Sequence, residues 1–115
     1  MLADRDAIYQ IMYNLCDNAV KFAADGGLLR ISLEHAKNKK VIVRVYNEGA
    51  GISKDDIPYV FERFYKSDKS RGLNKTGVGL GLYISKTIID AHSEKIWVES
   101  EHGKNCAFAF TLTVE

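Results

Sequence analysis

The chain has almost no net charge, few cysteines and no long apolar run. Its 16 Lys and Arg residues nearly balance its 15 Asp and Glu residues, so the charge does not point to nucleic acid or a membrane surface as a partner. No apolar stretch approaches the roughly 20 residues of a membrane-spanning helix, and the N-terminus does not resemble a signal peptide. These absences favour a soluble globular protein.

The two cysteines, Cys16 and Cys106, fall in a predicted helix and a predicted strand. Neither has a second Cys or a His at ligand spacing, so we do not expect a metal site built on them. Free thiols in a reducing compartment are favoured over a disulfide, because unpaired cysteines are common in protein cores.

At 115 residues the chain can form one core but not two, and no internal repeat or low-complexity tract divides it. We therefore expect a single domain over residues 1–115. Because Met1 stands directly before a predicted helix, we also expect this domain to be a fragment of a longer protein.

The first predicted element is a helix over residues 4–24, with Asp4 as its N-cap and the turn at residues 25–27 as its end. Helical spacing places its apolar residues on one face: Ile8, Ile11, Met12, Leu15, Ala19 and Phe22. A second stripe runs along the edge of that face: Asn14, Asn18 and Lys21. We expect the first face to be core and the second stripe to lie at the rim of a cavity.

An antiparallel hairpin is predicted next. Leu29, Ile31 and Leu33 alternate with polar residues, which predicts a strand with one buried face. After a polar turn, residues 41–46 are rich in β-branched side chains and predict a second strand, which ends just before Asn47.

The second half of the chain repeats this order after a long loop. Residues 53–76 lack a clean period, apart from a short helix suggested at residues 53–56. A second amphipathic helix ends near His92, and its predicted apolar face comprises Leu80, Tyr83, Ile84, Thr87, Ile88 and Ala91. Two strands follow, over residues 96–100 and 106–114. The order predicts an α+β fold: a two-layer sandwich of one mixed, mostly antiparallel sheet with helices on one face.

Three short sequence strings, residues 14–22, 47–52 and 77–82, contain the candidate functional residues. In the first, Asn14 and Asn18 can bring side-chain oxygens to one point, and oxygen ligands are those that Mg²⁺ prefers. Lys21, three residues further on, can place its ammonium on a phosphate. Taken alone, this stripe would be a pair of surface amides with a solvated lysine.

The other two strings are rich in glycine. Residues 47–52 place Asn47 at a strand end and follow it with Gly49 and Gly51, and glycine lets a planar ring approach the backbone closely. Residues 77–82 open the second helix, where unpaired N–H groups and the helix dipole favour an anion. Singly these strings indicate a turn and a flexible hinge. The ordered set of three indicates a pocket for a divalent metal and the phosphates of a nucleotide.

On these residues the chain resembles the catalytic and ATP-binding domain of two-component sensor histidine kinases. That domain belongs to a superfamily of ATPases that includes type II topoisomerases and heat-shock chaperones. The three strings resemble the family's N-box and its two glycine boxes, and residues 60–66 resemble the phenylalanine box at the base of the ATP lid. The resemblance covers essentially the whole chain and implies the two-layer sandwich of that superfamily.

The resemblance also implies an activity. The domain would bind Mg-ATP and transfer the γ-phosphoryl group to a histidine on a separate dimerisation domain, which the chain lacks. A response regulator would be the partner of the full-length kinase, with no nucleic acid involved. The isolated domain would be a monomer in the cytoplasm, as the cytoplasmic portion of a membrane-bound sensor.

The resemblance assigns the family's site residues to matching positions of this sequence. Asn18 would be the leading Mg²⁺ ligand, with Asn14 beside it. Phosphates would be bound by Lys21, by the lid cations Lys66 and Arg71, and by the glycine-rich start of the second helix: Gly77, Gly79, Leu80, Gly81 and Leu82. The nucleotide and its adenine would be flanked by the remaining positions: Phe22, Asn47, Gly49, Gly51, Ile52 and Phe64.

Two departures from the family pattern and one contrast with hydrolysing relatives matter. The first glycine box usually begins with Asp, and replacing that carboxylate by Asn47 predicts adenine binding weaker by about 1 kcal/mol. Hydrolysing relatives place a glutamate at position 14 as general base. Asn14 cannot accept a proton, which favours phosphotransfer over ATP hydrolysis. Ser93 and Glu94 replace a Gly-Gly pair, and we expect this to affect only a turn.

Two other functions stay open at this point. Asn47 also suits a degenerate nucleotide-binding or regulatory module with weak or no catalysis. An ATP-hydrolysing relative of the chaperone or topoisomerase class is disfavoured by Asn14. None of the three histidines, His35, His92 and His102, lies in a long helix beside an acidic residue, so the phosphoacceptor is expected on another segment.

Overall fold

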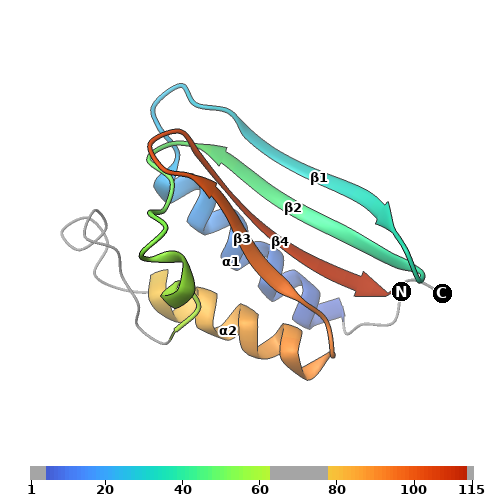
Figure 1. Cartoon of the computed structure of the whole chain (residues 1–115). Coiled ribbons are helices and arrows are strands. Elements are labelled where there is room, and N and C mark those ends of the chain that lie inside the picture. The colour runs from blue at the N-terminus through green and yellow to red at the C-terminus, as the bar shows by residue number, and fades with distance from the viewer. Residues whose placement is uncertain (1–4, 63–77, 114–115) are drawn as a thin grey trace.

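The computed structural model describes residues 5–62 and 78–113. Its elements in chain order are α1 (Arg5–Phe22), β1 (Leu29–Ala36), β2 (Lys40–Glu48), the short 3-10 helix η1 (Ile57–Tyr59), α2 (Val78–Ala91), β3 (Ile96–Glu101) and β4 (Asn105–Thr113). Figure 1 shows two layers, with α1 and α2 side by side on one face of the sheet. The predicted α+β sandwich is confirmed.

The sheet has four strands in the order β1-β2-β4-β3. All three pairings within the described residues are antiparallel, in a sheet that the sequence predicted to be mixed and mostly antiparallel. The hairpin between β1 and β2 closes through Asn38 and Lys39, which both have positive φ angles of 63° and 61°. Two such residues match the right-handed twist of the flanking strands.

The core lies between the sheet and the two helices. Alternate residues of β2 and β4 face the helices, and α1 contributes the face that its spacing predicted. The residues of these three elements that form the buried core cluster are Ile11, Leu15, Ala19, Val41, Val43, Val45, Cys106, Phe108, Phe110 and Leu112. Ile8 and Met12 pack against this cluster as partly buried residues.

The prediction that one face of β1 is buried is wrong. Leu29, Ile31 and Leu33 are 46%, 57% and 68% exposed. The cause is the position of β1 at the edge of the sheet, because α1 packs beneath β2 rather than beneath β1. Between α1 and β1 an apolar groove of about 290 Å³ remains open.

The predicted apolar face of α2 is also rotated from the observed one. The buried residues are Leu82, Ser85 and Ile89, whereas Tyr83 and Thr87 are exposed. Apolar residues occur on several sides of this helix, so its period does not define a single face. The polar Ser85 takes a fully buried position because it hydrogen-bonds Asn14 of α1.

Element boundaries differ from the expected ones by a few residues. Residues 53–56 form a turn, in which the Asp56 N–H donates to the Ser53 carbonyl at 3.0 Å, and the helical turn comes after it as η1. Helix α1 ends at Phe22 because Ala23 pairs with Gly49 in a β-bridge. Asp4, the expected N-cap, lies outside the described residues.

The turn after α2 does more than reverse the chain. Ser93 has a positive φ of 57°, and the Glu94 side chain that follows is only 5% exposed. Glu94 accepts hydrogen bonds from Lys40 of β2 and from Thr111 and Thr113 of β4, each at 2.7 Å. The expectation that these residues affect only a turn is therefore wrong for Glu94.

Candidate functional site

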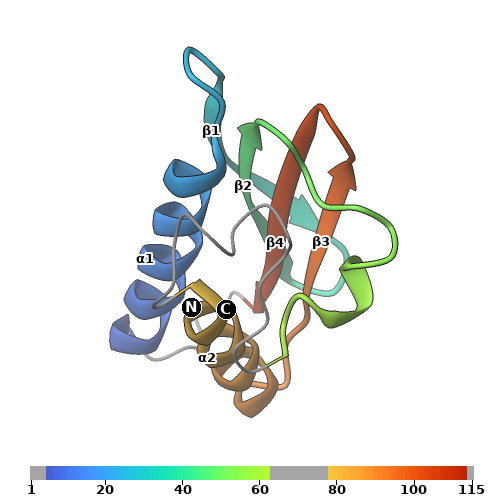
Figure 2. The same ribbon diagram turned by 90° about the vertical axis from the view of Figure 1, so that its left-hand side faces the viewer.

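The elements that carry the predicted site residues within the described ranges meet at one end of the molecule. The C-terminal ends of α1 and β2, the segment after β2 and the start of α2 all lie at the left of Figure 1, and Figure 2 views the molecule from that end. The Ala23–Gly49 bridge and a 2.8 Å hydrogen bond from the Ala24 N–H to the Glu48 carbonyl hold the ends of α1 and β2 together. The fold thus brings the first and second strings side by side.

Asn18 and Asn47 are the buried amides of this region, with 4% and 2% of each residue exposed. Asn47 lies on the face of β2 that carries the core, opposite Leu29 of β1 and Cys106 of β4. Within residues 5–62 and 78–113, the side-chain nitrogen Nδ2 of Asn47 has no hydrogen-bond partner. Burial raises the pKa of the neighbouring Cys106 thiol to about 12, so this thiol is neutral at pH 7. Asn47 is therefore a buried donor facing an uncharged neighbour.

Asn14 joins the two helices. Its Nδ2 donates to the Gly81 carbonyl at 3.2 Å and to Ser85 Oγ at 3.3 Å, and its Oδ1 accepts from Gln10 Nε2 at 3.0 Å. A flipped amide would set two oxygens against each other at Gly81, so the network fixes its orientation. In this arrangement Asn14 Oδ1, the atom that would coordinate a metal, accepts a hydrogen bond from Gln10.

Replacing Asn14 by aspartate should loosen the packing of α1 on α2. Asn14→Asp removes the donor to Gly81 and turns a carboxylate oxygen toward the Gly81 carbonyl, so we expect a loss of about 1–3 kcal/mol in the free energy of unfolding. Urea unfolding measures it. The matched control is Asn38→Asp, the same chemical change at an exposed position in the β1–β2 turn, with an expected effect within about 0.5 kcal/mol. Equal midpoints for the two variants would contradict the structural role of Asn14.

Lys21 makes an ion pair with Asp17, one helical turn earlier, at 2.9 Å. Both side chains are partly exposed, so the pair can open at little cost to stability. The side chain of Phe22 lies outside the described part of the chain.

The glycine segment after β2 is fixed to the β3–β4 hairpin. The Ile52 N–H donates to Ser100 Oγ at 2.7 Å, and Ser100 Oγ donates to the Asn105 carbonyl at 2.8 Å. The Gly49 N–H donates to the Lys104 carbonyl at 3.0 Å. Ser100 was not among the predicted site residues, because only the β3–β4 register brings it next to residues 49–52.

The second glycine string forms the first turn of α2 rather than a separate loop. Helix α2 begins at Val78, so Gly79 and Leu80 lie among its first residues, where backbone N–H groups have no partner within the helix. Gly81 packs against Asn14, and Leu82 is 4% exposed and belongs to the core. Gly77 lies outside the described residues.

The start of the phenylalanine box is anchored in the core. Val60 is buried, and the rings of Phe61 and Phe108 meet edge to face with their centroids 5.9 Å apart. Phe64, Lys66 and Arg71, the other residues predicted for the lid, lie outside the described residues.

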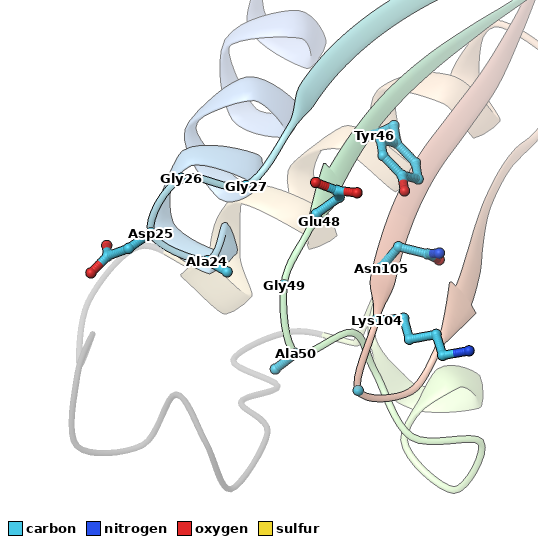
Figure 3. A pocket seen from close by; sticks show the side chains of 11 residues that line it. Ala24, Asp25, Gly26, Gly27, Tyr46, Glu48, Gly49, Ala50, Lys104 and Asn105 are labelled. Atoms are coloured by element: carbon cyan, nitrogen blue, oxygen red, sulfur yellow. The ribbon is translucent and has the colours of Figure 1, made fainter.

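A shallow hollow of about 640 Å³ lies at the same end but on the other face of β2 (Figure 3). Tyr46 and Glu48 line it, together with Lys104 and Asn105 of the neighbouring hairpin. Because side chains alternate along a strand, Asn47 points away from this hollow. Gly49 is the one predicted site residue in its lining, so the hollow is distinct from the predicted nucleotide pocket.

The described ranges contain no group of three or more His, Cys, Asp or Glu side chains placed to hold a metal ion. Any magnesium bound here would depend on amide oxygens and on the phosphates of its ligand. In the same part of the chain, no helix is long and apolar enough to cross a membrane. Both cysteines are free thiols, as the sequence predicted.

Buried amides, a glycine segment and the N-terminus of α2 thus lie toward one end of the four-stranded sheet. Residues 3–115 match the family of histidine kinase-, DNA gyrase B- and HSP90-like ATPases. The chain belongs to this family.

Individual relatives are sensor kinases. The sensor histidine kinase WalK of Bacillus subtilis (strain 168) is 39% identical over 110 residues, which are 95% of this chain and 18% of WalK. The mycobacterial sensor histidine kinase MprB superimposes with a TM-score of 0.87 at 26% identity, covering 98% of this chain and 76% of that one. Full-length ShkA, solved in complex with AMPPNP, gives a TM-score of 0.83 at 29% identity and covers 97% of this chain and 23% of ShkA. The chain thus spans about a fifth of WalK, and the resemblance to histidine kinase catalytic domains is confirmed.

Proposed function

We propose that this domain binds Mg-ATP and transfers the γ-phosphoryl group to a histidine on a separate dimerisation domain, in the cytoplasmic part of a two-component sensor kinase. The observation that carries the proposal is that the C-terminal ends of α1 and β2, which carry the buried Asn18 and Asn47, lie at the same end of the molecule as the N-terminus of α2, in a fold shared with sensor histidine kinases. A response regulator would receive the phosphoryl group from the full-length protein.

The residues present fit a magnesium nucleotide. Asn18 is a buried amide on the face of α1 that adjoins the core, and its oxygen is a hard, neutral ligand. Bound magnesium would neutralise charge on the β- and γ-phosphates as the phosphoryl group leaves. The N–H groups at the start of α2 would orient the phosphates, and Lys21 would reach them after leaving Asp17.

Transfer to histidine requires little acid–base chemistry from this chain. A neutral imidazole is itself a nucleophile, so no general base is needed at position 14. The Asn14 amide cannot accept a proton and holds α1 against α2 instead. Its role would be to position the glycine-rich start of α2.

The three histidines of the chain are poorly suited as acceptors. His35 lies in β1, His92 follows α2 with its Nδ1 2.9 Å from the Ile88 carbonyl, and His102 lies in the turn between β3 and β4. None stands on a long exposed helix in the described part of the chain. This supports a phosphoacceptor on a separate domain.

Titration with Mg-ADP tests the site. We expect Asn18→Ala to weaken Mg-ADP binding by about tenfold or more, since a contact to a charged group contributes about 1.5–3 kcal/mol. Binding of ADP in EDTA should change much less, because the lost ligand acts through the metal. Asn105→Ala, which removes an amide on the other face of the sheet, is the control variant and should keep native affinity.

The alternatives give different results. If the native chain binds no nucleotide, the proposal is wrong. A chain that binds Mg-ATP but does not phosphorylate a supplied histidine dimerisation domain would be a degenerate binding module. Asn47 also suits this alternative. Turnover of ATP without any acceptor would identify a hydrolysing relative.

A further inference from the structure

The glycine segment at residues 49–52 follows β2 and lies outside the helices and strands of the described chain. Its backbone is held by separate hydrogen bonds to the β3–β4 hairpin instead of by a regular ladder. The Gly49 N–H donates to the Lys104 carbonyl at 3.0 Å (Figure 3). The Gly103 N–H donates to the Ala50 carbonyl at 2.6 Å. The conformation of the segment therefore depends on a few individual bonds.

A further bond to the same segment uses a side chain, that of Ser100 in β3. The Ile52 N–H donates to Ser100 Oγ at 2.7 Å, and this hydroxyl donates its own hydrogen to the Asn105 carbonyl at 2.8 Å. Gly51 leaves room for this chain of bonds, because an added Cβ there would lie 2.9 Å from Ser100 Oγ. Ser100 thus links the segment after β2 to β4 through both its acceptor and its donor.

Ser100 lies in the same row across the sheet as Asn47. In this row Asn47 of β2 is opposite Cys106 of β4, and Cys106 is opposite Ser100 of β3. Residues that are opposite one another in an antiparallel pair share a face of the sheet. Ser100 therefore reaches the glycine segment from the face on which the proposed nucleotide site lies.

We propose that Ser100 is a positioning residue for nucleotide binding, whose hydroxyl holds residues 49–52 in the binding conformation before the nucleotide arrives. The proposal rests on the function proposed above, and it adds to that function a residue that contacts neither the nucleotide nor the metal. A site that is in its binding conformation for only a fraction of the time binds with an affinity reduced by that fraction. Ser100 keeps this fraction high.

A positioning role has its own kinetic signature. If the segment leaves the hairpin and returns rapidly, fewer molecules can accept the nucleotide at any moment, so the association rate constant falls. The dissociation rate constant stays the same, because the contacts to the bound nucleotide are unchanged. A residue that only stabilises the fold changes neither rate constant, whereas a residue that contacts the ligand changes dissociation.

Stopped-flow binding of Mg-ADP carrying a fluorescent N-methylanthraniloyl group tests the inference. For Ser100→Ala we expect the association rate constant to fall by about threefold to tenfold, the effect of a lost hydrogen bond, and the dissociation rate constant to stay within about twofold. Hydrogen exchange gives a second readout. The Ile52 amide should exchange slowly in the nucleotide-free native chain, faster in Ser100→Ala, and slowly again when this variant is saturated with Mg-ADP.

The matched control is Thr111→Val, which removes a hydroxyl with the same kinds of bonds near the other end of β4. Thr111 Oγ1 accepts a hydrogen bond from the Lys95 N–H at 3.0 Å and donates one to Glu94 at 2.7 Å. Its loss should lower the stability of the domain about as much as Ser100→Ala does. Both rate constants for Mg-ADP should keep their native values.

The outcomes separate this inference from the proposed function. An unchanged association rate constant in folded Ser100→Ala would overturn the inference and leave the proposed function intact, and so would a loss of affinity that lies in dissociation. Fast exchange of the Ile52 amide in the nucleotide-free native chain would also overturn it, whether or not the variant folds. Absence of nucleotide binding by the native chain would overturn both.

Discussion

Replacing Gly51 by alanine is expected to destabilise the domain by about 3 kcal/mol or more and to abolish nucleotide binding with it. Gly51 has a φ of 70°, which a residue with a Cβ adopts only under strain. An added Cβ would lie 2.7 Å from the Asn105 carbonyl oxygen, 2.8 Å from that of Glu101 and 2.9 Å from Ser100 Oγ. Two of these atoms belong to the backbone of the β3–β4 hairpin, so the segment after β2 would have to leave its position.

A second glycine separates the two expected causes of destabilisation, which are backbone strain and steric overlap of the added Cβ. Gly26 has a similar φ of 74°, but an added Cβ there would meet no heavy atom within 4 Å. Gly26→Ala therefore measures the backbone strain alone, for which we expect about 1 kcal/mol. Urea unfolding of both variants and calorimetry with Mg-ADP provide the comparison. Equal effects of the two substitutions would mean that close packing at Gly51 does not constrain the site.

Replacing Glu94 by alanine is expected to cost about 2–3 kcal/mol of stability. This carboxylate is 5% exposed and receives hydrogen bonds from Lys40, Thr111 and Thr113. Its loss would leave the Thr111 and Thr113 hydroxyls without their acceptor, whereas Lys40 keeps a hydrogen bond to Thr113 Oγ1 and, being a third exposed, recovers part of its hydration. Thermal or urea unfolding measures the change.

An exposed carboxylate serves as control. Glu99, on the other face of the sheet, pairs with Arg44 at 3.3 Å but is 49% exposed, so Glu99→Ala should cost less than about 1 kcal/mol. A cost for Glu94→Ala no greater than that for Glu99→Ala would show that the buried network does not stabilise the fold.

The contribution of Glu94 should depend on pH. Burial alone would raise the pKa of Glu94, but the hydrogen bonds from Lys40, Thr111 and Thr113 together lower it below the usual value of 4.5. The unfolded chain then binds more protons than the folded one, so this stabilisation is present above about pH 4.5 and is lost as the pH falls through the lowered pKa. The stability difference between the native chain and Glu94→Gln should therefore shrink in acid.

The sequence predicted the helices and strands better than it predicted which of their faces are buried. Both helices and the four strands of the described sheet were predicted, although the period of α2 did not define which of its faces is buried. Periodicity says which residues share a face but not what covers that face. Leu29, Ile31 and Leu33 alternate well, and they are exposed because β1 is an edge strand beyond the reach of α1.

In the candidate site, too, local spacing was predictable from the sequence and contacts between distant segments were not. The spacing of Asn14 and Asn18 on one helix was readable, since helical geometry is local. The use of Asn14 to hold Gly81 and Ser85, and the support of residues 49–52 by Ser100, depend on contacts between segments about 50 to 70 residues apart. No local pattern marks those partners.

By itself, the sequence determined the family, the order of helices and strands, and the glycine and amide strings that predict a nucleotide site. Each of these depends on neighbouring residues along the chain. The tertiary structure alone decided that Asn47 is buried with a donor that is unpaired within residues 5–62 and 78–113, that a Cβ at Gly51 would meet the β3–β4 hairpin, and that Glu94 links the turn after α2 to β2 and β4. These properties arise where strands pair and helices pack, because burial and hydrogen-bond partners are set by segments that meet only in the folded chain.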